Sequence, residues 1–165
     1  MVRVRLMVLL LVGSCASTGQ HQDVHLAPNA PEDRPVHVTG DDPDAALAKW
    51  RALITPLVEK AKATYPAAKG RYLAGLPSQQ TFFVTTLLRD QQGHFEYVFI
   101  VVQRIAEQRV TGRIATQVNL VRGYRGGDSV TVPEAEVLDW MISKPDGSEE
   151  GNLVGKFLDT QAQQQ

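Results

Sequence analysis

The sequence has little of the chemistry on which many enzymes depend. It contains one cysteine, Cys15, so a single chain cannot build a disulfide framework. Of its four histidines only His94 lies in the part expected to fold, which leaves few ways to pair a hydroxyl nucleophile with a histidine base. Apolar runs are short as well: Leu6–Val12 falls well below the roughly 20 residues that a membrane-spanning helix needs. These absences disfavour triad catalysis and a spanning helix.

The first fourteen residues, "MVRVRLMVLLLVGS", run from charged through apolar to small, and Cys15 follows them. This order is typical of a secretory signal peptide, which is removed from the mature protein. The tetrapeptide "VGSC" also resembles the bacterial lipobox, whose cysteine is lipidated and becomes the mature N-terminus. The resemblance implies that residues 1–14 form a lipoprotein signal peptide and that Cys15 is the lipid attachment site. The alternative is an ordinary signal peptide with an incidental cysteine.

A lipidated Cys15 has consequences for chemistry and location. Its thiol becomes a thioether, which leaves the mature domain without a thiol for catalysis. We expect a lipoprotein of the bacterial cell envelope that faces the periplasm, with the membrane as a partner through its N-terminal lipid. Ala16, where an aspartate would stand in a retained protein, favours the outer membrane by analogy with bacterial sorting.

The residues behind the anchor are polar and rich in proline. The stretch "ASTGQHQDVHLAPNAPEDRPVHVTG" has no apolar period from which to build a core. Its three histidines could scavenge metal, but they lack ordered spacing and cysteine partners, which favours a polar spacer. We therefore expect a lipid-anchored flexible tether over residues 15–40, a single domain over 41–159 and a disordered tail over 160–165.

The charge balance limits the partners. Loss of Arg3 and Arg5 with the signal peptide leaves 15 basic against 18 acidic residues, a net charge of −3. Recognition of nucleic acid or of an anionic membrane surface calls for a basic patch. We expect no nucleic-acid partner, and the sequence leaves the oligomeric state open.

The domain begins with a helical pattern. Asp42 can cap a helix that starts at Pro43. We expect Pro56 to kink or restart this helix and Pro66 to restart it again, as a short helix that ends at Gly75. The apolar positions recur with helical period: Leu47, Trp50, Ile54, Leu57, Val58, Ala61 and Tyr65.

Extended patterns follow. "TFFVTTLLRD" and "HFEYVFIVVQRI" predict a hairpin with Gly93 in its turn, and the apolar residues on both faces of the second strand predict a central position. "RVTGRIAT", "SVTVP" and "EVLDWMIS" predict three more strands, the first of them after a tight turn at Glu107-Gln108. The fold class predicted is α+β: N-terminal amphipathic helices packed on a small antiparallel sheet, or half-open barrel, of about five strands.

Paired carboxylates are the most serious catalytic candidate, because acid/base hydrolysis needs one protonated and one ionised acid across a substrate. The acids considered are Glu96, Asp139, Asp146, Glu149 and Glu150. The last three belong to "KPDGSEEGN", a turn sequence in which acids usually serve solubility. Glu96 and His94 share a strand face, but two ligands without a third make a poor metal site. We expect no metal and no cofactor.

Two further features are candidates for binding. If Trp140 fills the core, Asp139 faces the other way or caps a neighbouring loop; if Trp140 is exposed, it can anchor a partner. The loop "VRGYRGGD" groups Tyr124 and Arg125 among glycines, which fits a contact with a protein or an anionic glycan as well as it fits a mobile basic turn.

Several short elements in order carry a resemblance to a family. The chain resembles the bacterial domain of unknown function family 2314, which includes YegJ-like proteins, over about residues 60–157. The resemblance implies a fold more readily than an activity. The elements are Glu96 in an aromatic strand, Gly127-Asp128 before a strand, Asp139-Trp140-Met141 and Gly151-Asn152.

Two functions remain. The first is a non-catalytic module that binds a protein partner, for example an immunity protein against a toxin that acts in the periplasm. It rests on a small β-rich domain, a long tether and the shortage of catalytic groups. The alternative is a carboxylate-dependent hydrolase or carbohydrate-binding accessory of the cell wall, which requires a cleft that joins Glu96 to Asp139 or Asp146. The sequence favours the first and predicts that the protein is not an enzyme.

Overall fold

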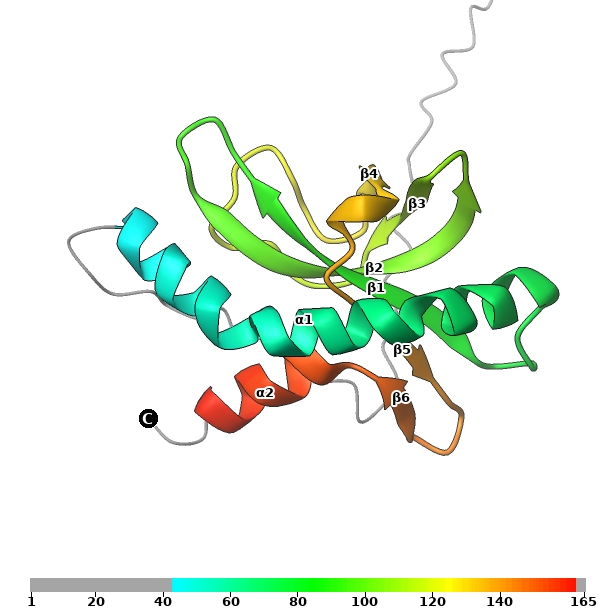
Figure 1. Cartoon of the computed structure of the whole chain (residues 1–165). Helices are drawn as coiled ribbons and strands as arrows, with labels where there is room; N and C mark the ends of the chain where they lie inside the picture. Colours follow the sequence, from blue (N-terminus) through cyan, green and yellow to red (C-terminus); the bar gives the residue numbers. More distant parts are fainter. Residues whose placement is uncertain (1–42, 163–165) are drawn as a thin grey trace, which may run out of the picture.

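The computed structural model describes residues 43–162 (Figure 1). The expected signal peptide, Cys15 and the tether lie outside the described residues. No helix in the described part is long and apolar enough to cross a membrane. In chain order the elements are α1 (Pro43–Ala74), β1 (Thr81–Arg89), β2 (Phe95–Ala106), β3 (Arg109–Ile114), β4 (Ser129–Pro133), the 3-10 helix η1 (Glu134–Glu136), β5 (Asp139–Ser143), β6 (Glu149–Gly151) and α2 (Leu153–Ala162).

The strands form one six-stranded sheet in the order β4-β3-β2-β1-β5-β6, with every neighbouring pair antiparallel. The α+β class is confirmed, with one strand more than the five expected. β1 and β2 lie at the centre, as the apolar residues on both faces of β2 predict. Gly112 permits the close approach of β3 to β2, because a Cβ there would lie 2.1 Å from the carbonyl oxygen of Val101.

The expected turns are present. Gly93 has φ +88° in the turn between β1 and β2, and Glu107 and Gln108 both have positive φ, at 52° and 56°, between β2 and β3. Two consecutive residues with positive φ form the two-residue turn whose twist matches that of the flanking hairpin strands. Gly75, with φ +95°, follows the last residue of α1.

The several expected N-terminal helices are one helix. α1 continues through Pro56 and Pro66, although an internal proline removes a hydrogen bond and costs about 3 kcal/mol. Both prolines are exposed, and the buried face runs past each of them, so tertiary packing offsets the local cost. The buried residues of this face are Leu47, Ile54, Ala61, Tyr65 and Ala68.

The C-terminal part differs most from expectation. "KPDGSEEGN" forms a hairpin, in which Gly147 has φ +82° and the Lys144 amide donates to the Ser148 carbonyl oxygen at 2.9 Å. Its second arm is β6, paired with β5 through Met141 and Gly151. α2 follows and continues through Ala162, past the domain end expected at residue 159. A three-residue strand of acids and glycine carries no alternating pattern that would reveal it.

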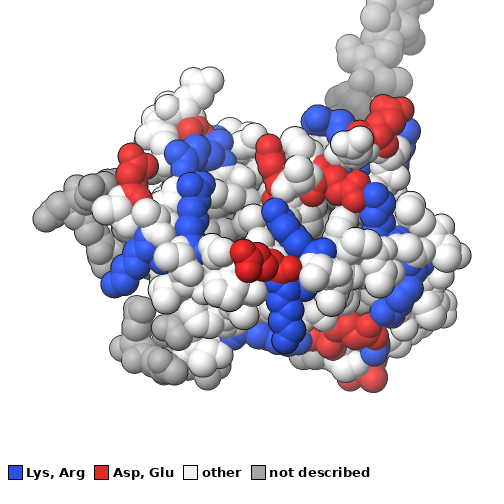
Figure 2. Space-filling model, in the orientation of Figure 1, with Lys and Arg blue, Asp and Glu red and all other residues white. Residues whose placement is uncertain are grey.

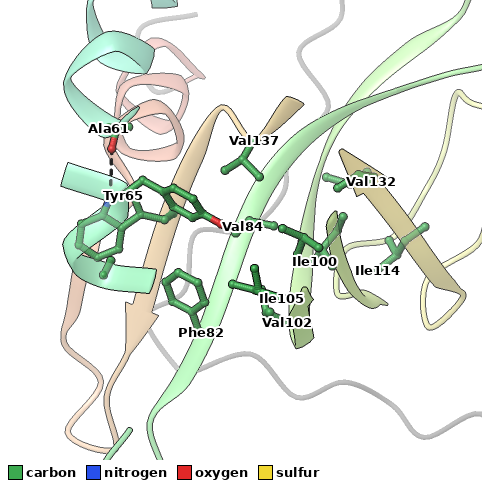
Figure 3. Packing of buried hydrophobic residues seen from close by; sticks show 14 of the residues in the cluster. Ala61, Tyr65, Phe82, Val84, Ile100, Val102, Ile105, Ile114, Val132 and Val137 are labelled. Atoms are coloured by element: carbon green, nitrogen blue, oxygen red, sulfur yellow. Dashed lines mark hydrogen bonds between the residues drawn. The ribbon is translucent and has the colours of Figure 1, made fainter. Parts of the chain in front are cut away.

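The sheet divides the core in two. Its inner face is the one against which α1 packs, with Ala61 and Tyr65 of α1 toward Phe82 and Val84 of β1 (Figure 3). Val121 and Val137, from segments outside the sheet, join the same cluster. The outer face carries a smaller cluster of buried residues, Phe83, Phe99 and Met141, with Val101 and Ala115 packed against it.

Candidate binding groove

A groove of about 710 Å³ lies between the N-terminal half of α1 and the ends of β1 and β2 that meet at their hairpin. β5 begins at Asp139, opposite Thr85, so the last residues of β1 have no strand beside them on that side. The groove occupies this region. Its lining residues are Arg51, Ile54, Thr55, Val58, Glu59 and Lys62 of α1, Thr86, Leu87 and Arg89 of β1, Tyr97 of β2, and Glu136 and Leu138.

Charged groups surround the apolar floor of this groove. Lys62 donates from Nζ to the Ala135 carbonyl oxygen at 3.3 Å. Within residues 43–162, no hydrogen bond or ion pair engages the guanidinium of Arg51 or Arg89. Burial raises the pKa of Tyr97, against the lowering effect of nearby Arg51. Figure 2 shows basic side chains over the area between the start of α1 and the β1–β2 hairpin, with acidic ones to either side. The lining thus carries three basic side chains against two acidic ones, Glu59 and Glu136, which gives the groove a small excess of positive charge next to apolar surface.

Glu96 does not lie in this groove. Its side chain is on the inner face and accepts backbone N–H groups from the loop that follows β3: Asn119 at 3.0 and 3.1 Å, Leu120 at 2.9 Å and Val121 at 3.5 Å. The residue is 4% exposed. A buried carboxylate that accepts several amide protons is satisfied without a substrate, so Glu96 fixes the loop.

Asp139 plays a matching part on the outer face. Its carboxylate accepts the Trp140 amide at 2.7 Å and the Val154 amide at 2.6 Å, and the latter belongs to the first turn of α2. The residue is 1% exposed, and burial raises its pKa to about 6 although the backbone donors and Lys156 favour the ion. Asp139 thus faces away from Trp140, as expected, and caps the start of α2.

Trp140 is a core residue. Its indole Nε1 donates to the Ala61 carbonyl oxygen at 3.2 Å and lies 3.0 Å from Thr64 Oγ1, so it ties β5 to α1. Its ring belongs to the inner-face cluster. The packing interpretation of Trp140 is confirmed, and its surface is not available as a binding anchor.

The basic loop has a mixed structure. Tyr124 is half-buried and packs against the inner-face cluster, whereas Arg125 is exposed and its amide donates to the Asp128 carboxylate at 2.8 Å. Gly127 has φ +86° and its amide donates to the Ile114 carbonyl oxygen at 2.8 Å. The Gly-Asp pair therefore closes the loop and starts β4.

The acids of the β5–β6 hairpin serve local structure. Asp146 accepts the amide and the hydroxyl of Ser148, and these two hydrogen bonds lower its pKa. Glu149 pairs with Lys156 at 3.0 Å and accepts from Asn152 Nδ2 at 3.2 Å. Both acids thus have partners within the hairpin and α2.

The proposed carboxylates are not brought together. Glu96 is paired with Leu88 of the inner face, whereas Asp139 is paired with Thr85, an odd number of positions away on the same strand. Because strand side chains alternate, the two carboxylates point to opposite faces of the sheet. No group of three potential metal ligands occurs in the described part of the chain.

Two features escaped the sequence analysis. Asp90 accepts the amides of His94 and Arg122 at 2.9 and 3.0 Å and pairs with the His94 ring at 2.8 Å. Burial alone would raise its pKa, but these contacts lower it to about 2. Its position three residues before Gly93 is a turn signal that could have revealed it. The groove had no such signal, because its sides come from distant segments.

The comparisons with known proteins agree with the resemblance seen in the motifs. A family model described as an uncharacterized protein conserved in bacteria (DUF2314) matches residues 57–164. No curated protein and no solved structure matches the chain. In this fold the motif residues have structural parts: Glu96 holds a loop, Asp139 caps α2, and Gly151, with φ +77°, lies against the Trp140 backbone. The match covers well over half of the chain, which therefore belongs to the DUF2314 family of bacterial proteins.

Proposed function

We propose that this domain is a non-catalytic module that binds a protein partner, and that the groove beside α1 receives a segment of that partner. The observation that carries the proposal is that Arg51 and Arg89, whose guanidinium groups have no partner among the described residues, lie next to an apolar floor that includes Leu87 and Tyr97. Arginine and aromatic residues dominate binding energy at protein interfaces. A partner segment with acidic residues beside apolar ones fits this surface.

The carboxylate alternative has less support. It needs one protonated and one ionised acid facing a substrate. Glu96 and Asp139 instead face opposite sides of the sheet, and each accepts backbone amides. A cell-wall hydrolase would have to use other residues. Degradation of purified cell wall by the native chain, lost in Glu96→Gln, would restore that alternative.

The experiment is affinity capture with the full chain from envelope and secreted fractions, read by mass spectrometry. The test variant carries Arg51→Glu and Arg89→Glu in the groove. The control carries Arg122→Glu and Arg125→Glu in the exposed loop, with the same change of net charge. We expect one partner to be captured in stoichiometric amount by the native chain and by the control, and lost from the groove variant.

Each other outcome is informative. Loss from the loop variant alone would move the binding surface to Tyr124 and Arg125, and an empty capture would contradict a protein-binding module. If the captured partner is a toxin, co-expression of the native chain should protect cells from it and the groove variant should not. This result would support the immunity version of the proposal.

The location is a separate part of the proposal. A lipid on Cys15 would hold the module at the periplasmic side of the envelope. Metabolic labelling with a fatty-acid analogue should mark the native chain and not Cys15→Ala. Retained label in that variant would refute the anchor.

A further inference from the structure

The last part of β1, Thr86–Arg89, has a strand on one side only among the described residues. The register of β1 with β5 stops at the pair of Thr85 and Asp139, whereas its register with β2 continues to Arg89. We call Thr86–Arg89 the open edge of β1. A strand edge of this kind presents backbone N–H and C=O groups with which another chain can pair.

Hydrogen bonds on either side of the open edge show which backbone groups face it. The Thr85 carbonyl oxygen accepts the Leu138 amide at 2.9 Å, so the backbone of Thr85 faces the β5 side. The Asp90 amide donates at 3.0 Å to the carbonyl oxygen opposite it in the hairpin, so Asp90 faces β2. Because successive residues of a strand alternate between its two sides, the N–H and C=O groups of Leu87 and Arg89 face the open edge. Within residues 43–162 they have no backbone partner there.

The segment before β5 leaves the plane of the sheet and so does not cover this edge. The Leu138 amide bonds to Thr85 although the register sets Asp139 opposite Thr85, so two residues face one. This is the pattern of a β-bulge, which bends a strand and ends its pairing. Thr86 donates from Oγ1 to the Glu136 carbonyl oxygen at 3.2 Å. The Thr86 side chain is on the inner face, so the segment passes over that face.

We propose that the partner segment in the groove binds as an added β-strand, antiparallel to the open edge of β1. This inference rests on the proposed function, because the open edge lies in the same groove, and it adds the conformation and the side-chain pattern of the occupant. In strand addition the main-chain hydrogen bonds supply affinity and alternate side chains supply specificity. The antiparallel direction is that of every neighbouring pair in this sheet.

The side chains of the open edge define the sequence that fits it. Leu87 and Arg89 are two positions apart, so they point to the same face, and both line the groove. Directly opposite residues of paired strands contact each other, which favours an apolar residue opposite Leu87 and an acidic one opposite Arg89. In an antiparallel segment the acid comes first. The predicted pattern is therefore an acidic residue, any residue, then an apolar residue.

The groove has room for a short strand. Its volume of about 710 Å³ lies within the range of about 300–1,000 Å³ that is usual for ligand pockets. Four residues of an extended chain measure about 13 Å. Arg51 lies across the groove on α1, and its guanidinium has no partner among the described residues, so a second acid in the partner segment would have a cation to meet.

The first experiment reads the pattern directly. A display library of random short peptides is selected on the full chain, with the Arg51→Glu, Arg89→Glu groove variant and the Arg122→Glu, Arg125→Glu loop control in parallel. We expect the native chain and the control to retain peptides enriched in the acid-any-apolar pattern among β-branched residues. Apolar residues at helical spacing, or no enrichment over the groove variant, would overturn the added strand.

A pair of substitutions at one position then separates backbone from side chain. Leu87→Pro and Leu87→Ala both remove the leucine side chain, but only proline removes the N–H. Since this N–H faces the open edge, proline breaks no hydrogen bond between β1 and β2. A retained peptide should bind Leu87→Pro about tenfold more weakly than Leu87→Ala, measured by fluorescence anisotropy.

The outcomes distinguish this inference from the proposed function. Equal affinities of Leu87→Pro and Leu87→Ala would refute the added strand and leave the protein-binding module in place, because binding would still depend on the groove arginines. An empty capture from envelope and secreted fractions would refute the module itself.

Hydrogen exchange tests the open edge without any substitution. In the free full chain the amides of Leu87 and Arg89 should exchange at least about tenfold faster than those of Thr86 and Leu88, which face β2. A saturating retained peptide should slow exchange at Leu87 and Arg89. Protection of these two amides in the free chain, or no change when the peptide binds, would contradict the proposal.

Discussion

The two faces of the sheet are closed in different ways. On the inner face α1 and the loop after β3 supply side chains to the core, and two polar anchors, Trp140 Nε1 and the Glu96 carboxylate, fasten them. On the outer face the cluster consists almost wholly of strand residues, and its one polar anchor, Asp139, holds α2 at the end of β5. The comparison shows that one sheet builds two cores of different kinds, a larger one shared with a helix and a loop and a smaller one made almost wholly by its own strands.

The largest expected effect compares Phe82 and Phe83, which are adjacent in sequence and point to opposite faces. Phe82→Ala should lower the free energy of unfolding by about 3–5 kcal/mol, since Phe82 stacks on Tyr72 with ring centroids 5.2 Å apart. Phe83→Ala should cost nearly as much, because Phe83 is 0% exposed and packs in a buried cluster with Phe99 and Met141. Urea unfolding measures both. A much smaller cost at Phe83 than at Phe82 would show that the outer-face cluster adds less to the stability of the domain than the inner-face cluster does.

The next effect concerns pH and Asp139. Its folded-state pKa of about 6 lies above the usual aspartate value of 3.8, so the folded chain binds more protons than the unfolded chain between these values. The contribution of Asp139 is therefore most favourable below pH 4 and declines as the pH rises through 6, by on the order of 2–3 kcal/mol. Urea unfolding of the native chain, compared with Asp139→Asn at each pH, isolates it. If the free energy of unfolding of the native chain rose relative to that of Asp139→Asn with increasing pH, the raised pKa of Asp139 would be contradicted.

The stabilising contribution of Asp90 depends on pH in the opposite direction to that of Asp139. Its pKa of about 2 means that its stabilising contribution is present above pH 4 and is lost as the pH falls through 2. Asp90→Asn should therefore be less stable than the native chain at neutral pH. The difference in free energy of unfolding between the two chains, measured by urea unfolding, should shrink as the pH falls through 2.

A substitution of Glu96 tests how much its hydrogen bonds to the loop after β3 stabilise the inner face. Glu96→Gln keeps the size of the side chain but leaves one oxygen to accept amide protons, and we expect a loss of about 2 kcal/mol. Hydrogen exchange at Asn119, Leu120 and Val121 should become faster, while amides of α2 keep their protection. Equal loss of protection in α2 would show that the two carboxylate anchors are coupled through the sheet.

The smallest effect is expected at the surface. Arg71 pairs with Glu150 at 2.6 Å, and its hydrogen bond and that of Lys144 lower the pKa of Glu150 to about 2. Exposed ion pairs are worth about 0–1 kcal/mol, so Arg71→Ala should change the free energy of unfolding by less than about 1 kcal/mol. A larger loss would mean that α1 depends on β6 more than on the core.

The parts of the fold that the sequence predicts correctly have strong local causes. The β1–β2 hairpin follows from two long β-branched and aromatic runs around Gly93, and the turn at Glu107-Gln108 follows from its place between two such runs. The sequence predicts several helices where the structure has the single helix α1. The reason is that proline disfavours a helix locally, whereas the buried face that keeps α1 continuous is stabilised by tertiary packing.

The parts that could not be predicted depend on distant segments. β6 has no apolar pattern of its own and exists because β5 offers it backbone partners. The groove joins Arg51 to Arg89, which are far apart in sequence and meet only when α1 packs on the sheet. Glu96 and Asp139 were correctly singled out as unusual acids, but the loop amides and the helix end that explain them lie 23 and 15 residues away.

The hydrogen bond between Trp140 and Ala61 has a consequence for the order of folding. It spans 79 residues, and so do the bonds from Arg71 to Glu150. Closing so long a loop is entropically costly, and folds dominated by such contacts form slowly. During synthesis α1 is complete long before β5 exists, so this proline-containing helix must wait for a strand near the other end of the chain.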